Sequence, residues 1–124
     1  MDRRDISDLD DVRLLVNTFY DKVREDKILA PVFNDRIGKE WPRHLEKMCR
    51  FWQTILLGEH TYSGAPFQRH TNLPVEHVHF QKWLELFHSS VDVLFAGEKA
   101  EEAKRRGSKI AEMFEMKIKH PDRL

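Results

Sequence analysis

Histidines close to aromatic residues are the side chains of this chain that could do chemistry. Residues 67–84 read FQRHTNLPVEHVHFQKWL. His70 lies in a loop-like stretch that ends at a proline, and the helix predicted after it carries Phe80, Trp83 and Leu84 on its inner face. A lone imidazole beside an aromatic wall is the arrangement that a buried haem iron requires. From the pattern alone, however, His70 is one loop histidine among seven.

Two other polar side chains lie unusually close to apolar stripes. His44 lies about 40° from Met48 within the stripe of a helix predicted at 41–57. The pattern favours a core or boundary histidine bonded to a backbone carbonyl, with a functional imidazole as the alternative. Tyr20 lies about 100° from Phe19 at the edge of its own stripe, so its hydroxyl could face a pocket or water. The pattern favours a boundary tyrosine.

Metal sites built from several side chains are disfavoured. Two Glu-x-x-His motifs, at 76–79 and 85–88, are typical of di-iron bundles, but they lie about 180° around one predicted helix and roughly 13 Å along it. The lone Cys49 cannot form a thiolate zinc site, and at about 140° from His44 we interpret it as buried core sulfur. We expect the remaining histidines at the surface: His60, His77, His79, His88 and His120.

The composition is typical of one folded domain without net charge. A chain of 124 residues buries about two thirds of its unfolded surface, which leaves room for one core and one large ligand. Lys and Arg number 21, as do Asp and Glu, so no net field favours nucleic acid or an anionic membrane. The N-terminal MDRRDISDLDD contains no exporting or anchoring apolar stretch. We therefore expect a soluble cytoplasmic protein.

The elements that must position these side chains are all helices, because apolar residues recur at helical spacing and no β alternation is sustained. The first helix is predicted to begin after Ser7 as N-cap, with Asp10 completing an approximate capping box. A corner with one turn of helix follows at 28–38, then helices at 41–57, 75–95 and 98 to about 120. The last helix should turn these residues inward: Ala103, Gly107, Ile110, Phe114 and Ile118.

Four fragments of the chain resemble one known family in their order and spacing. They are FYDKVREDKILAPVFNDRI at 19–37, FW..ILLGE at 51–59, Y.GAPF..H..LP at 62–74 and HF..WL.LF at 79–87. Together they resemble the group III truncated haemoglobins, bacterial two-over-two globins, over about residues 9–114. The chain lacks the glycine pairs typical of groups I and II, which supports group III.

The resemblance implies an all-α, globin-like fold, a truncated two-over-two helical sandwich formed as a single domain over residues 1–124. It implies haem b (iron protoporphyrin IX) held between the His44 helix and the His70 segment. His70 matches the proximal iron ligand, Tyr20 and Trp83 match distal residues, and His44 matches a distal gate. The resemblance also implies distal or side walls from Phe19, Phe33, Met48 and Trp52, more proximal walls from Phe67, Leu73, Val78 and Phe80, and a propionate partner in Arg69.

The implied function is binding of oxygen and other diatomic ligands (CO, NO) at a five-coordinate iron in a polar distal pocket. If Tyr20 and Trp83 each contributed roughly 1 to 1.5 kcal/mol through a hydrogen bond, oxygen would escape on the order of a hundredfold more slowly. Slow release of oxygen suits NO dioxygenase or peroxidase-like chemistry, with an unidentified reductase, better than oxygen transport. We expect a monomer or weak dimer without nucleic-acid or membrane partners. A haem-free helical interaction or sensor domain is the alternative.

Overall fold

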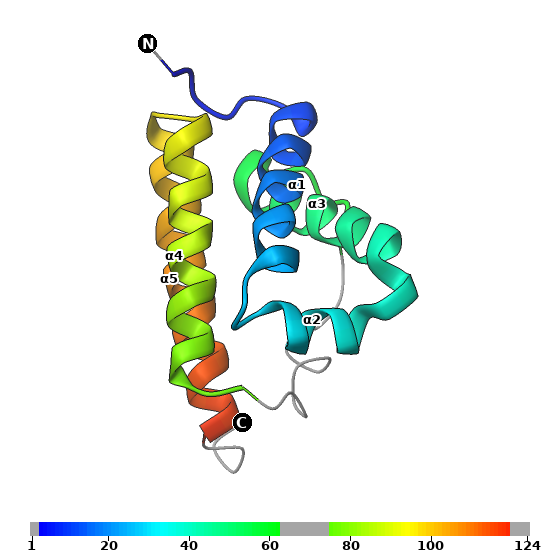
Figure 1. The fold of residues 1–124 in the computed structure, drawn as a ribbon. Helices are drawn as coiled ribbons and strands as arrows, with labels where there is room; N and C mark the ends of the chain where they lie inside the picture. Colours follow the sequence, from blue (N-terminus) through cyan, green and yellow to red (C-terminus); the bar gives the residue numbers. More distant parts are fainter. Residues whose placement is uncertain (1–2, 63–74, 120–124) are drawn as a thin grey trace.

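The computed structural model describes residues 3–62 and 75–119 (Figure 1). Within these ranges the chain forms helices and no strand, which confirms the all-α prediction. In chain order the elements are α1 (Leu9–Glu25), α2 (Ala30–Ile37), a 3-10 helix (Gly38–Glu40), α3 (Trp41–Leu57), α4 (His77–Leu94) and α5 (Glu98–Lys119). The helices α4 and α5 lie side by side, and α1 packs against both α3 and α4.

The first helix begins one residue later than predicted. Asp8, not Ser7, is the N-cap of α1, and its carboxylate accepts the backbone N–H of Asp11 at 3.0 Å. The buried carboxylate of Asp11 in turn accepts the N–H of Ser7 at 2.8 Å and pairs with the guanidinium of Arg4. Because Ser7 serves this carboxylate, it is not available as a cap. The predicted capping box of Ser7 and Asp10 is therefore wrong.

The corner between the first two long helices holds more helix than predicted. The helix α2 has eight residues, with Pro31 in its first turn, where the missing N–H costs little. The bounds of α3 agree with the prediction, and Pro42 again occupies the first turn. Gly58 ends α3 with a φ of 70°, the left-handed conformation in which glycine commonly ends helices.

The helix α4 begins two residues later than predicted because a capping box fixes its first turn. Glu76 is the N-cap, and its backbone N–H donates to Nδ1 of His79 at 3.0 Å. The carboxylate of Glu76 accepts the backbone N–H of His79 in return.

The first turn of α5 is capped by a residue that lies far away in the sequence. The carboxylate of Asp5 accepts the N–H groups of Lys99 and Ala100, each at 2.9 Å.

The core contains an aromatic stack between the two halves of the molecule. The ring of Phe87 lies between Trp52, with centroids 4.9 Å apart, and Trp83, at 5.4 Å, both nearly parallel to it. Phe19 meets Phe87 edge-on at 5.3 Å. A Cβ atom added to Gly107 of α5 would lie 2.8 Å from the Phe87 ring, so this close approach requires glycine. Cys49 is buried nearby in the core, as predicted.

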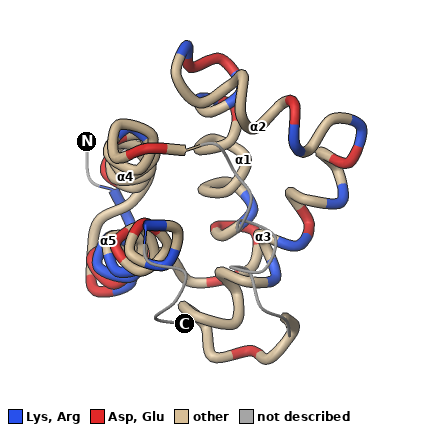
Figure 2. The backbone as a smooth tube through the Cα atoms, turned by 90° about the horizontal axis from the view of Figure 1, so that it is seen from below, with Lys and Arg blue, Asp and Glu red and all other residues tan. Residues whose placement is uncertain are grey.

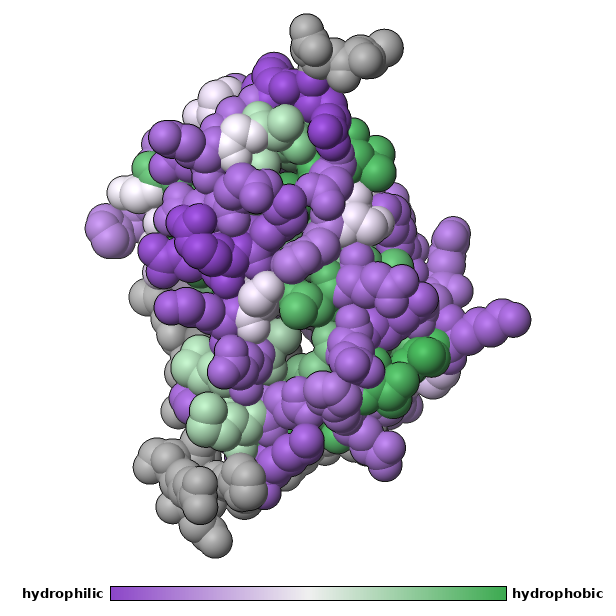
Figure 3. Space-filling model, turned by 90° about the vertical axis from the view of Figure 1, so that its left-hand side faces the viewer, coloured by the Kyte–Doolittle hydropathy of each residue, from purple (hydrophilic) through white to green (hydrophobic). Residues whose placement is uncertain are grey.

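The charged residues follow the outer faces of the helices. Figure 2 shows Lys and Arg interspersed with Asp and Glu on these faces, without a block of one sign over a whole helix. The face formed by α4 and α5 is largely hydrophilic, with separate hydrophobic spots (Figure 3). No helix in the described ranges is both long enough and apolar enough to span a bilayer.

Candidate functional site: an apolar cavity lined by all five helices and their connections

A cavity lies between α1, α2, α3, the N-terminal half of α4 and the C-terminal half of α5. The space between its lining side chains is about 830 Å³ when open solvent is included. Of the lining side chains that the structure describes, three carry polar groups, those of Tyr20, His79 and Trp83. The remaining lining residues are aliphatic or aromatic, or carry a thioether: Leu29, Phe33, Met48, Phe51, Trp52, Val75, Phe80, Ile110, Ala111, Phe114 and Ile118.

The structure brings six of the residues that the sequence suggested for a site to this cavity. They are Tyr20, Phe33, Met48, Trp52, Phe80 and Trp83. Four others lie outside the described residues: Phe67, Arg69, His70 and Leu73. The remaining three, Phe19, His44 and Val78, are described but do not line the cavity.

The residues Phe19 and Val78 differ from expectation for opposite reasons. Phe19 is 2% exposed and lies one layer behind the cavity, where its ring contacts Trp83 edge-on at 5.2 Å. It supports the wall rather than forming it. Val78 is 44% exposed. It lies two residues before Phe80, which is about 200° around the helix, so it faces outward when Phe80 faces the cavity.

Tyr20 is buried, contrary to the boundary position that its place in the stripe favoured. Its ring is enclosed by Phe33 from α2 at 6.4 Å and by Trp41 from α3 at 5.8 Å. Burial raises the pKa of Tyr20 above its ordinary range, because the phenolate would lose its hydration. The hydroxyl therefore stays protonated at neutral pH and can donate a hydrogen bond.

His44 lies behind Tyr20 rather than in the cavity wall. The two rings meet edge-on with centroids 5.1 Å apart, and the His44 ring meets Trp41 in the same way at 5.6 Å. The residue is half-buried, and its Nε2 atom is fully buried. His44 is thus turned inward in this structure.

His79 is the functional candidate that the sequence interpretation missed, because it was expected to be solvated. It is half-buried and lines the cavity. The backbone N–H of Glu76 donates to its Nδ1, so this nitrogen carries no proton, and the neutral ring holds its proton on Nε2. In this tautomer Nε2 offers a hydrogen-bond donor and no lone pair for a metal. The available signal was the Glu-x-x-His spacing at 76–79, which forms a capping box here but was considered in the sequence only as a di-iron motif.

Other lining residues were predicted to face inward but were not assigned to a site. Ile110, Phe114 and Ile118 of α5 follow one another at intervals of four residues, so they share one helix face. Their spacing predicted burial, but it could not show that they enclose a cavity instead of filling a core. Leu29, in the turn before α2, offered no periodic signal.

The histidines away from the cavity have mixed outcomes. His60 and His77 are exposed as predicted, and His77 pairs with Glu115 at 2.6 Å. His88 is half-buried, contrary to prediction, because its Nε2 lies 3.1 Å from the carbonyl oxygen of Lys104 on α5. His120 lies outside the described residues. Among the residues that the structure describes, no three His, Cys, Asp or Glu side chains form a metal cluster.

Comparisons with known proteins agree with this geometry. Residues 6–119 match the family model described as bacterial-like globin. The sequence is 39% identical over 105 residues to Group 3 truncated hemoglobin ctb of Campylobacter jejuni, covering 82% of this chain and 83% of the relative. The fold matches the crystal structure of the group III truncated hemoglobin from Campylobacter jejuni with a TM-score of 0.86, at 34% identity and 94% coverage of each chain. The chain therefore belongs to the bacterial-like globin family, as a group III truncated haemoglobin.

Proposed function

We propose that this chain binds haem in the apolar cavity and thereby binds diatomic gases. The observation that carries the proposal is the cavity itself, because its wall is mostly apolar and includes Phe33, Phe51, Trp52, Phe80 and Trp83. When bound, haem supplies an iron that can take O2, CO or NO at an open coordination position. The single cysteine cannot provide the paired thiols of covalent haem attachment, which favours haem b.

The cavity wall fits haem in its chemistry. A porphyrin is flat and mostly apolar, so aromatic and aliphatic walls favour its transfer from water. Of the described histidines, only His79 lines the cavity. Its Nδ1 lone pair accepts the backbone N–H of Glu76, so the ring proton is on Nε2. The structure therefore argues against His79 as the iron ligand.

We propose His70 as the iron ligand. It lies outside the described residues, but it precedes the lining residue Val75 by five positions. Chain connectivity alone keeps its backbone within about 18 Å of the Cα atom of Val75. An imidazole within that reach can enter the cavity while its Nδ1–H donates to another group, which is the usual arrangement of a haem-binding histidine.

The polar side chains of the wall suit a ligand that carries partial negative charge. Tyr20 can donate its hydroxyl hydrogen, and Trp83 can donate its indole N–H. Two such bonds at about 1–1.5 kcal/mol each would slow ligand escape by on the order of a hundredfold. Slow release favours chemistry on the ligand over delivery. We therefore propose turnover of NO or peroxide with a separate reductase, testable as NO consumption by the reduced, oxygenated protein.

A visible absorption spectrum tests the haem proposal directly. We expect a Soret band in the purified protein, or after addition of haemin, that shifts on reduction and again with CO. The variant His70→Ala should lose stable haem, whereas His79→Ala and His44→Ala should keep it. A wild-type protein that stays colourless with excess haemin would refute haem binding. Loss of haem in His79→Ala but not in His70→Ala would reassign the ligand.

A further inference from the structure

We propose that Trp41, anchored by Asn34 on one edge and Arg24 on one face, is the positioning residue that keeps His44 turned inward against Tyr20. The proposal rests on the proposed function and on the gate role that the family resemblance implies for His44. It assigns roles to three residues that do not line the cavity: Arg24, Asn34 and Trp41.

Three rings form a closed triangle of edge-to-face contacts at the start of α3. Trp41 meets His44 at 5.6 Å and 88°, and Tyr20 at 5.8 Å and 63°. Tyr20 meets His44 at 5.1 Å and 85°. Because edge-to-face contact is a favoured geometry for aromatic pairs, each ring holds the other two in place. His44 follows Trp41 by three positions on the same helix, so the two side chains are direct neighbours.

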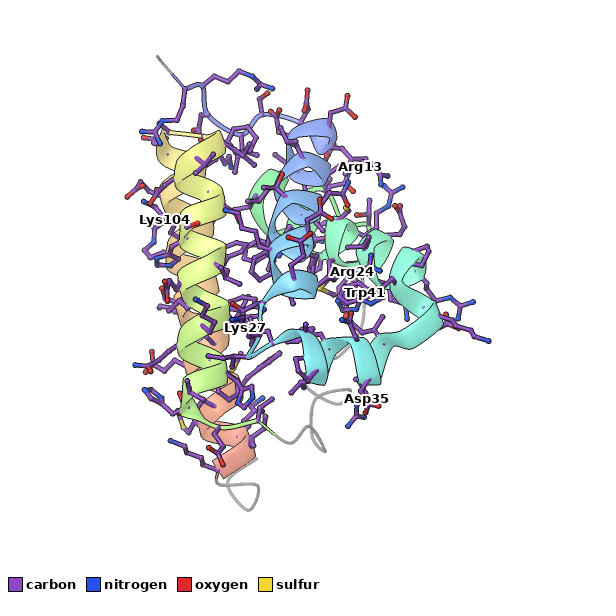
Figure 4. All side chains as sticks on the ribbon, in the orientation of Figure 1. Arg13, Arg24, Lys27, Asp35, Trp41 and Lys104 are labelled. Carbon is purple, nitrogen blue, oxygen red and sulfur yellow. The ribbon has the colours of Figure 1, made fainter. Side chains whose placement is uncertain are left out.

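Trp41 is the fixed member of this triangle because two other elements hold it. Its indole N–H donates to the side-chain oxygen of Asn34 on α2 at 3.1 Å. The guanidinium carbon of Arg24, near the end of α1, lies 4.6 Å from the ring centroid, within cation–π distance. Figure 4 shows Arg24 beside Trp41 where α1 passes the start of α3. The ring is only 5% exposed although it lies at a helix end.

These contacts give His44 a defined inward position. An outward rotation of His44 would break its contacts with both Tyr20 and Trp41. Loosening Trp41 would remove one of the two walls that define this position, without altering the Tyr20 hydroxyl or the cavity wall. Arg24 is exposed and contacts the ring of Trp41. We therefore expect Arg24 to affect His44 through its contact with Trp41.

The variant Arg24→Gln tests the proposal without disturbing the core. We expect CO association, followed after flash photolysis of the CO complex, to become about two- to fivefold faster, the factor that a cation–π contact of about 0.5–1 kcal/mol represents. CO dissociation should rise by a similar factor and leave the affinity unchanged, because a gate changes both rates together. A residue that only stabilises the fold would lower the unfolding midpoint and leave both rates unchanged.

The matched control is Lys27→Gln, which removes the same charge from an exposed position that lies apart from Trp41 in Figure 4. It should keep wild-type rates. Asn34→Ala should act in the same direction as Arg24→Gln, because it removes the other anchor of Trp41. Equal rates in Arg24→Gln, Asn34→Ala and Lys27→Gln would overturn the proposal.

A second readout separates this proposal from the haem proposal. The ring protons of His44 should show ring-current shifts from Trp41 and Tyr20 in the NMR spectrum of the purified protein, and these shifts should diminish in Arg24→Gln. If no Soret band forms, haem binding fails while the His44 shifts still report the anchor. If the Soret band forms and Arg24→Gln leaves the His44 shifts unchanged, the anchor fails while haem binding stands.

Discussion

The two ends of the α4–α5 pair are packed in opposite ways. At the end near the N-terminus, the buried residues of α5 are small: Ala100, Ala103 and Gly107. At the other end, large half-buried side chains surround the cavity: Phe80, Trp83, Ile110, Phe114 and Ile118. The same two helices therefore provide a solid core at one end and ligand space at the other. Side-chain size along α5, rather than a break in the helix, separates the two functions.

Polar contacts of the N-terminal segment reinforce the solid end. Asp5 caps α5, and Arg4 pairs with the buried Asp11 of α1, so the segment before α1 joins two helices. At the hollow end, the polar side chains among the described lining residues are those of Tyr20, His79 and Trp83. Stability and binding should therefore respond to different substitutions.

The largest difference is expected between two phenylalanines of α4 that lie seven residues apart on one face. Phe87→Ala should lower the free energy of unfolding by about 3–5 kcal/mol, because Phe87 is 1% exposed and lies between two tryptophans. Phe80→Ala should cost less than half as much, because Phe80 is half-buried beside existing space. Urea unfolding of the haem-free proteins measures both. Equal losses would mean that the two ends are packed alike.

Acid should weaken the solid end through Asp11. Burial raises the pKa of Asp11, but the hydrogen bonds from Arg4 and Ser7 outweigh this effect and lower it from 3.8 to about 2. A lowered pKa stabilises the fold fully above the unfolded value, and this stabilisation, about 2 kcal/mol, is lost as pH falls from about 4 towards 2. The variant Asp11→Asn should flatten the decline in unfolding free energy over this range. Asp10→Asn, which removes an exposed carboxylate from the same turn, should keep the wild-type profile.

The hollow end should respond in ligand kinetics. Tyr20→Phe removes the hydroxyl and keeps the ring contacts with Trp41 and His44. We expect oxygen to dissociate about tenfold faster, as the loss of one hydrogen bond of about 1–1.5 kcal/mol implies. Displacement of oxygen by CO in a stopped-flow instrument measures the rate. Tyr62→Phe, at a ring that packs on Phe51 and does not line the cavity, is the control. No change in Tyr20→Phe would rule out a hydrogen bond to the ligand.

Sequence patterns predicted those parts of the fold that local chemistry determines. The bounds of α3 followed from Pro42 in its first turn and Gly58 after its last. The first turn of α1 was misassigned because the carboxylate of Asp11 competes for the Ser7 donors, a contact that involves Arg4 from outside the helix. Local signals locate a helix, but the packing of neighbouring segments decides its first residue.

The site was less predictable because burial at the edge of a stripe depends on other elements. Tyr20 is enclosed by Phe33 of α2 and Trp41 of α3. These contacts could not be predicted from the sequence of α1 alone. His88 is held by a backbone carbonyl sixteen residues further along the chain. The roles suggested for His70 and His44 came from the family resemblance, since the spacing of residues alone gave them no function.

The glycine at position 107 has a consequence for how this sequence can diverge. A methyl group there would collide with the Phe87 ring, which holds Trp83 at the cavity wall. A larger residue at 107 is therefore compatible with this fold only where position 87 carries a smaller one. We therefore expect the residues at positions 87 and 107 to change together among relatives. Relatives that differ at both positions should also differ in the width of the binding site.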